Sequence, residues 1–170
     1  VDAVFGRQRV VHADGTLQAE RTQRWNAQFR RLEPGFSPSN LWSALVQQFP
    51  MNGMMLRRSV ALAAGVPPEA EVGHHTDLHF GIRYALTAER PFLLIADEVS
   101  AYRWSPQSIR RSAGVYELDG DLDYAALAAI EPRDALERAG KRHALNVASS
   151  WAVLALVAKG RRREALEVFV

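Results

Sequence analysis

Three histidines and an aspartate lie close together, at His74, His75, Asp77 and His79. His75 and His79 are four residues apart, so they would share one face of a helix, as pairs of zinc ligands often do. No glutamate follows the first histidine as in metalloprotease motifs, and no third ligand is evident nearby. We expect these histidines to line a polar pocket or the surface, and a metal-dependent hydrolase is the alternative.

Thr76 and Asp77 begin a segment with helical periodicity, in which Leu78, Ile82 and Ala85 share one face. Side-chain oxygens at a helix start bond the free backbone N–H groups, so Asp77 is a candidate cap. The same position suits a proton acceptor, because the helix dipole favours the ionised carboxylate. The residues alone leave both roles open.

Arginines occur in local clusters that suit phosphate groups or anionic membrane surfaces, because guanidinium binds phosphate oxygens with two parallel hydrogen bonds. The clusters are Arg30-Arg31, Arg57-Arg58, Arg110-Arg111 and Arg161-Arg162-Arg163. The formal net charge is only +2, and interspersed acidic residues leave no long basic stripe. We therefore expect no nucleic-acid partner.

The composition is that of a globular protein, with 48% hydrophobic and 24% charged residues among 170. This length is enough for one domain, or one domain with a small appendage. Cysteine is absent, which excludes disulfides and thiolate chemistry and fits a reducing cytoplasm. The most apolar stretch, residues 148–158, is about half the ~20 residues that a membrane span needs. We expect the chain not to cross a membrane.

Turn and cap signals divide the first part of the chain into short elements. Residues 1–20 predict a β-hairpin around an Asp-Gly turn, and residues 22–32 an irregular or short helical segment. A helix is expected from Ser39-Asn40 to about Phe49. A strand is expected over residues 51–56, then a helix ending at Gly65 and a loop over residues 67–73.

The remaining elements alternate at first and are then helical. A helix is expected from about Thr76-Asp77, a buried strand over residues 92–95 and a second extended piece over residues 99–104. Beyond residue 124 the sequence is rich in Ala, Leu, Arg and Glu and predicts two or three helices, divided near Gly140 and Gly160.

Four segments, in order, resemble the second half of a family 2 glycosyltransferase. They are Val10-Val11-His12-Ala13-Asp14-Gly15, the strand ending in Arg57-Arg58, Thr76-Asp77-Leu78-His79-Phe80-Gly81-Ile82-Arg83, and Tyr102-Arg103-Trp104-Ser105. The third resembles the family block Glu-Asp-x-Asp-Leu-x-x-Arg, and the fourth resembles Tyr-Arg-x-His. Thr76, His79 and Ser105 depart from these patterns.

The resemblance implies an α/β fold: a partial GT-A-like mixed sheet with flanking helices over residues 1–115. A small α-helical C-terminal region would follow over residues 116–170. The implied reaction is inverting transfer of a sugar from a nucleotide-sugar donor to a hydroxyl of a sugar or lipid-linked acceptor. Bacterial polysaccharide or glycoconjugate biosynthesis is the implied setting, in the cytoplasm. The arginine clusters would allow peripheral contact with the inner face of the membrane.

Asp77 matches the aspartate that acts as general base in the family. The implied substrate-binding residues are Asn52, Gly53, His79, Tyr102, Arg103 and Ser105. Enzymes of the family use a divalent metal, Mg or Mn, whose main ligands would not be in this chain. The Asp121-Leu122-Asp123 sequence follows the whole block, so we do not expect it to be the family's metal motif.

No segment resembles the nucleotide-binding half of such enzymes. We therefore expect that half upstream of Val1, and we expect the chain alone not to transfer sugar. The departures at Thr76, His79 and Ser105 leave an alternative, a non-catalytic protein-interaction module derived from a transferase fold.

Overall fold

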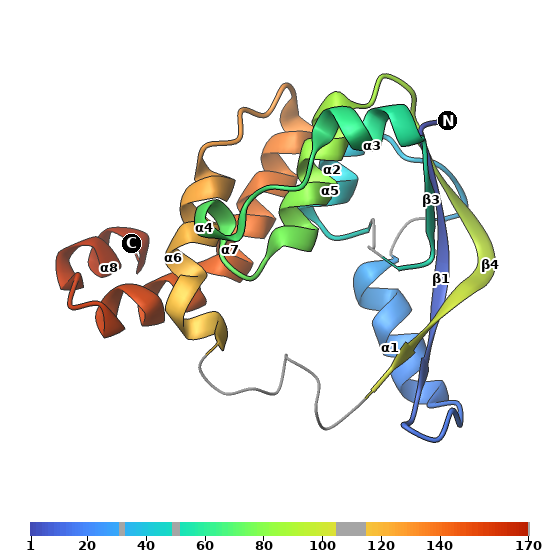
Figure 1. Cartoon of the computed structure of the whole chain (residues 1–170), viewed down its shortest axis with the longest axis horizontal. Coiled ribbons are helices and arrows are strands. Elements are labelled where there is room, and N and C mark those ends of the chain that lie inside the picture. Colours follow the sequence, from blue (N-terminus) through green and yellow to red (C-terminus); the bar gives the residue numbers. More distant parts are fainter. Residues whose placement is uncertain (31–32, 49–51, 105–114, 170) are drawn as a thin grey trace.

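The computed structural model describes residues 1–30, 33–48, 52–104 and 115–169. A mixed open sheet, covered on one face by α1 (Ala19–Phe29), stands beside a group of packed helices (Figure 1). The architecture is therefore α/β, with a four-stranded sheet, flanking helices and further helices at the C-terminal end, which confirms the expected class at this level.

The sheet has the strand order β2-β4-β1-β3. Its strands are β1 (Ala3–Val11), β2 (Gly35–Phe36), β3 (Met54–Leu56) and β4 (Phe92–Arg103). β1 runs parallel to β4 and antiparallel to β3, while β2 runs antiparallel to β4. The central position of β1 fits its inward-facing apolar side chains, Ala3, Phe5 and Val10, which are almost fully buried.

The expected hairpin over residues 1–20 is wrong. The Asp-Gly turn forms, with Gly15 at a φ of 90°, but only one bridge, between Val11 and Leu17, follows it. The chain then enters α1. β1 pairs with β4 from Ala3 to Val11 along its other edge. On the hairpin side, Thr22 Oγ1 and Asn26 Oδ1 of α1 accept from the Val10 and Gln8 N–H groups in place of a second strand.

The helices other than α1 form one group in Figure 1. They are α2 (Asn40–Leu45), α3 (Arg58–Ala64), α4 (Glu69–Val72), α5 (Thr76–Thr87), α6 (Val115–Ala128), α7 (Ala135–Ala158) and α8 (Arg162–Phe169). The predicted starts of α2 and α5 and the predicted end of α3 are confirmed. Ser39 caps α2 by accepting a hydrogen bond from the Trp42 N–H at 3.2 Å.

Three expectations about helix boundaries were wrong. α2 ends at Leu45, before the expected end near Phe49, because Gln47 has a φ of 56° that does not continue a helix. The helix break expected near Gly140 does not occur, and Gly140 lies within α7. A Cβ at Gly140 would be 3.0 Å from Trp42 Cδ1. That glycine allows α7 to pack closely on α2. The loop expected over residues 67–73 contains the short helix α4. The break near Gly160 is confirmed, with a φ of 74°.

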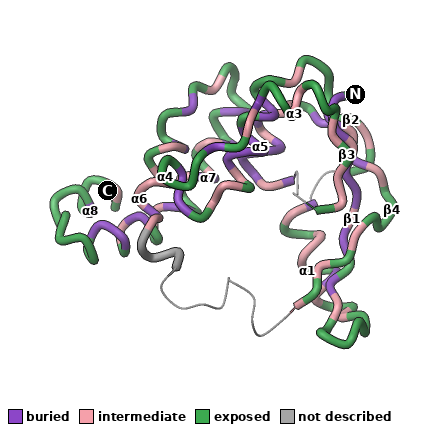
Figure 2. Tube along the Cα trace, in the orientation of Figure 1, coloured by how far each residue is buried: buried purple, intermediate pink, exposed green. Residues whose placement is uncertain are grey.

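One hydrophobic core joins the sheet to the helices. Its members include Phe5, Leu41, Tyr84, Phe92 and Leu127, from β1, α2, α5, β4 and α6. Figure 2 shows the buried residues concentrated where these elements meet, while α8 is mostly exposed. The core therefore fixes α5, which carries the aspartate singled out above, relative to both the sheet and α6.

Among the helices within the described ranges, none is both long enough and apolar enough to span a bilayer.

Candidate functional site

The first turn of α5 is the best-anchored of the segments that carry predicted site residues. α4 ends at Gly73, whose φ of 61° turns the chain, and α5 then begins at Thr76. His74, His75 and His79 lie in or beside this turn. Each bonds a carboxylate of α6, so the turn is held against that helix.

Asp123 is the buried centre of these contacts. Its Oδ1 lies 2.7 Å from His79 Nε2, and its Oδ2 lies 3.1 Å from His75 Nδ1. Burial alone would raise the pKa of the Asp123 carboxyl, but the hydrogen bonds from the two imidazoles outweigh it and hold that pKa below its usual value. Each carboxylate oxygen thus accepts from one imidazole N–H.

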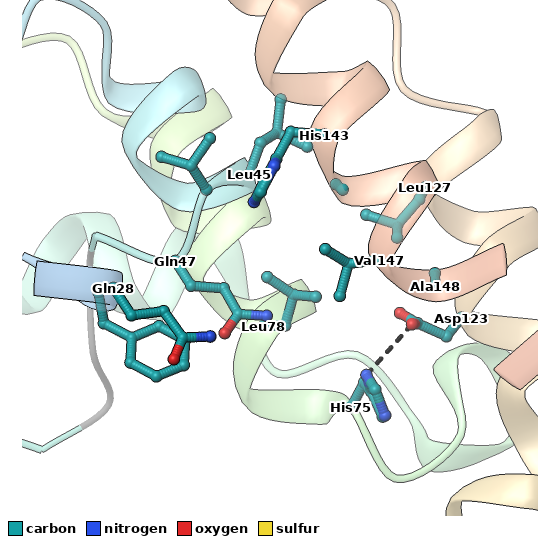
Figure 3. Close-up of a pocket in the computed structure, with 13 residues that line it drawn as sticks. Gln28, Leu45, Gln47, His75, Leu78, Asp123, Leu127, His143, Val147 and Ala148 are labelled. Carbon is teal, nitrogen blue, oxygen red and sulfur yellow. Dashed lines mark ion pairs between the residues drawn. The ribbon is translucent and has the colours of Figure 1, made fainter. Parts of the chain in front are cut away.

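A cavity of about 110 Å³ opens beside this turn (Figure 3). Its polar lining consists of Gln28, Gln47, His75, Asp123 and His143. Its apolar lining consists of Phe29, Leu45, Val46, Leu78, Leu127, Ala144, Val147 and Ala148. The two glutamines lie toward one end of the cavity in Figure 3, and the His75–Asp123 pair lies toward the other. Amide and imidazole groups above an apolar wall can bind a small polar ligand such as a sugar.

Asp77 is exposed and lies on the same turn as two cavity-lining residues, His75 and Leu78. Its Oδ1 accepts a hydrogen bond from the Leu78 N–H at 2.8 Å, so it bonds a free donor of the helix start. Within the part of the chain that the structure describes, its carboxylate has no ion-pair partner. Asp77 is near the cavity but is not among the residues that line it.

His79, predicted to bind substrate, is buried and bonds Asp123. It is not among the lining residues of the cavity. Its contact makes it part of the anchor between α5 and α6.

A second cluster surrounds Gln8 on the sheet and includes Asn52 and Gly53. The Gln8 side-chain amide donates to the Asn52 backbone carbonyl at 3.1 Å, to Asn52 Oδ1, and to Ser100 Oγ at 3.0 Å. Gly53 has a φ of 72°, and a Cβ there would overlap the Ser100 side chain. Only glycine fits this turn without strain, because both the backbone angle and the space exclude a side chain.

The end of β4 presents Tyr102 and Arg103. The Tyr102 ring stacks on Trp25 of α1 with ring centroids 4.9 Å apart, and Trp25 Nε1 donates to Gln8 Oε1 at 3.0 Å. Arg103 is exposed and donates to the Ala13 carbonyl at 3.3 Å. Ser105 lies outside the described residues. Tyr102 therefore joins the cluster around Gln8, and Arg103 lies at its border.

Arg30, which the sequence placed in an arginine cluster suited to phosphate or a membrane surface, is instead buried beside this cluster. Its Nη2 donates to Gln8 Oε1 at 3.0 Å, and its other bonds go to backbone carbonyls. Burial lowers the pKa of Arg30 to about 10. Among the described residues, the Arg30 guanidinium therefore donates to backbone and amide oxygens and not to a carboxylate.

The predicted site residues therefore fall into two groups. Asn52, Gly53 and Tyr102 meet around Gln8, while Asp77 and His79 lie at the start of α5. Figure 1 shows the start of α5 next to α4 and α6, and the end of β4 next to α1. Asp123 was the main residue missed, although it is part of the Asp-x-Asp sequence at 121–123.

No family model matches the chain, and neither the curated proteins nor the solved structures contain a match.

Proposed function

We propose that this chain is the acceptor-side part of an inverting glycosyltransferase. It would help to transfer a sugar from a nucleotide-sugar donor to a hydroxyl of a sugar or lipid-linked acceptor in bacterial glycoconjugate assembly. The proposal rests on the resemblance of four ordered segments to family 2 enzymes. One structural observation supports it most: Asp77 is an exposed carboxylate, without an ion-pair partner in the described ranges, beside a cavity with an apolar wall and five polar side chains.

In this proposal Asp77 acts as the general base. The acceptor hydroxyl attacks the anomeric carbon opposite the leaving diphosphate, and its proton passes to a carboxylate oxygen of Asp77 as the new bond forms. The bonds of His75 and His79 to Asp123 keep this turn from moving away from α6.

The cavity next to Asp77 is the candidate acceptor pocket. Gln28 and Gln47 carry amides that can donate to and accept from sugar hydroxyls, and Leu78 and Val147 offer apolar contact for a ring face. Asn52, Gly53, Tyr102 and Arg103 would lie toward the donor. Stabilisation of the leaving diphosphate by Arg103 would require the donor to extend from the end of β4 to the start of α5, because the two groups lie apart (Figure 1).

The divalent metal that the resemblance implies, Mg or Mn, does not fit the described residues near Asn52 and Arg103. Within the described ranges, the three ligand atoms that converge belong to Glu69, His74 and Asp119, on the side of α4 and α6. This position does not suit a metal that holds the donor diphosphate beside the end of β4. The mechanism above therefore uses only side chains of this chain.

The experiment that tests the proposal replaces Asp77 by Asn in the full-length protein. Asparagine keeps the size of the side chain but cannot accept the proton, so we expect kcat to fall about 10²–10⁴-fold with donor affinity unchanged. Turnover is measured with purified nucleotide sugars, and donor binding by calorimetry.

Asp97→Asn is the matched control, because Asp97 is an exposed aspartate on β4 and is part of neither cluster. It should leave kcat unchanged. Wild-type turnover in Asp77→Asn would remove the proposed role of Asp77.

A non-catalytic interaction module is the second candidate. One observation favours it: Leu154, Val157, Leu166 and Phe169 on α7 and α8 are large apolar side chains that are 48% to 78% exposed. A full-length protein that binds no nucleotide sugar and turns none over would support this candidate over the transferase.

A further inference from the structure

Glu69, His74 and Asp119 bring three metal-ligating atoms together on the side of α5 that faces α4 and α6. His74 Nδ1 lies 2.7 Å from Asp119 Oδ2 and 3.3 Å from Glu69 Oε1. All three atoms lie within 4.8 Å of one another. The residues come from three segments, namely α4, the turn before α5, and α6, so tertiary packing creates the group.

The imidazole of His74 cannot donate to both of the carboxylates that face it. One imidazole nitrogen carries at most one proton, yet two carboxylates face Nδ1 of His74. At most one of them can accept a full hydrogen bond, and the other is left beside a second negative charge. A cation at the meeting point would balance both carboxylates.

The neighbouring cluster at Asp123 provides an internal comparison. There two imidazoles face two different oxygens of one carboxylate, so each acceptor has its own donor. These two adjacent groups, which share α6, therefore differ in their balance of donors and acceptors. The Asp123 group is complete as a set of hydrogen bonds, and the His74 group has an excess of acceptors.

We infer that Glu69, His74 and Asp119 bind a divalent transition-metal ion such as Zn²⁺. Zinc binds imidazole nitrogen and carboxylate oxygen at about 2.0–2.2 Å, which places tetrahedral ligands roughly 3.3 Å apart. The spacing of His74 and Glu69 already has this value, and Asp119 needs to move away from His74 by about 0.6 Å. Water completes the coordination, because Glu69 is 63% and His74 37% exposed. The bound ion joins α4 to α6. This inference does not depend on the proposed transferase activity.

The glycine before His74 allows the turn to approach α6 closely. Gly73 precedes His74, and a Cβ at Gly73 would lie 2.5 Å from Asp119 Cβ. A larger residue there would push α6 away from the turn and separate the carboxylate of Asp119 from the imidazole.

Calorimetric titration of the purified protein with Zn²⁺, in a buffer that does not chelate metals, tests the inference. We expect one ion per chain, with Kd raised at least about tenfold in His74→Ala and in Asp119→Asn. Glu69→Gln, on the exposed face of α4, should also weaken binding, and its fold is not at risk. Mg²⁺ should not compete, because it prefers oxygen ligands to imidazole.

His12→Ala is the matched control, since His12 is exposed in the turn after β1 and should bind zinc as the wild type does. Circular dichroism of each variant verifies its fold. Two results would overturn the inference: Zn²⁺ affinity that is equal in wild type, His74→Ala and Glu69→Gln, or tight binding that survives His74→Ala and is lost in His79→Ala.

Discussion

Asp123 holds the first turn of α5 through two imidazoles, and its side chain is only 3% exposed. Its removal would leave His79 buried without this partner and would remove the contact between Asp123 and His75. We expect Asp123→Ala to lower the free energy of unfolding by about 3 kcal/mol, because one member of a buried, hydrogen-bonded group is lost. Urea denaturation followed by circular dichroism measures this change.

Asp97→Ala serves as the reference for Asp123→Ala, because Asp97 is exposed and its loss should change stability by less than about 0.5 kcal/mol. Equal stability of the two variants would show that the His–Asp contacts do not anchor α5.

At the residue scale the sequence indicated the right histidines but not their partner. His79 and Asp123 are 44 residues apart, and they meet only because the core packs α6 against α5. Periodicity reports which face of a helix a residue occupies, but not which helix lies opposite. The cluster around Gln8 was missed for the same reason, since Asn26, Asn52 and Ser100 reach it from three other segments.

α7 is the longest element, and its start is fixed by a local motif that the sequence contains. Asp134 caps the helix by accepting from the Glu137 N–H at 2.8 Å. Glu137 accepts from the Arg133 side chain and backbone and from Ser39 Oγ at 2.9 Å. The last contact joins α7 to α2, so this buried carboxylate ties the C-terminal helices to the rest of the core.

Because of this arrangement, the stability of the protein should fall at acid pH. The hydrogen bonds from Arg133, which outweigh burial, lower the pKa of Glu137 from 4.5 to about 2. A pKa that is lower in the folded state stabilises the fold above the unfolded value, and the contribution is lost as the pH falls from about 4.5 to 2. We expect the wild type to lose about 1–3 kcal/mol more stability over this interval than Glu137→Gln.

Denaturation curves at pH 5, 4, 3 and 2 give this difference. Parallel pH profiles of the wild type and Glu137→Gln would contradict the assigned role of Glu137, whereas a shallower profile of the variant is the expected result.

Elements with strong local signals were predicted well. Ser39 caps the start of α2, and Gly65 follows the end of α3, as predicted. The segment with the predicted apolar face is the helix α5. Failures occurred where distant contacts decide. β1 pairs with β4 over its length, and the expected hairpin does not form. Gly140 lies inside a helix, where the absence of a side chain leaves room for a neighbouring tryptophan.

At the scale of the whole molecule, the sheet and the helices share one core, although the sequence suggested a division near residue 115. Leu127, Ala144 and Ala148 of the helical region pack with Leu41 and Phe80. The composition change after residue 114 therefore marks a change from alternating elements to helices, while the two parts bury their apolar faces together. Composition alone cannot show such packing, because it carries no information on which faces meet.

The central claim is that Asp77 acts as the single base in a direct displacement at an anomeric carbon. Proton NMR of the sugar product formed by the full-length protein tests it, since the coupling constant at the anomeric carbon reports its configuration. One displacement inverts the configuration of the donor, so we predict a product with the opposite anomeric configuration. A product that retains the configuration of the donor, or no product from any nucleotide sugar, would contradict this account.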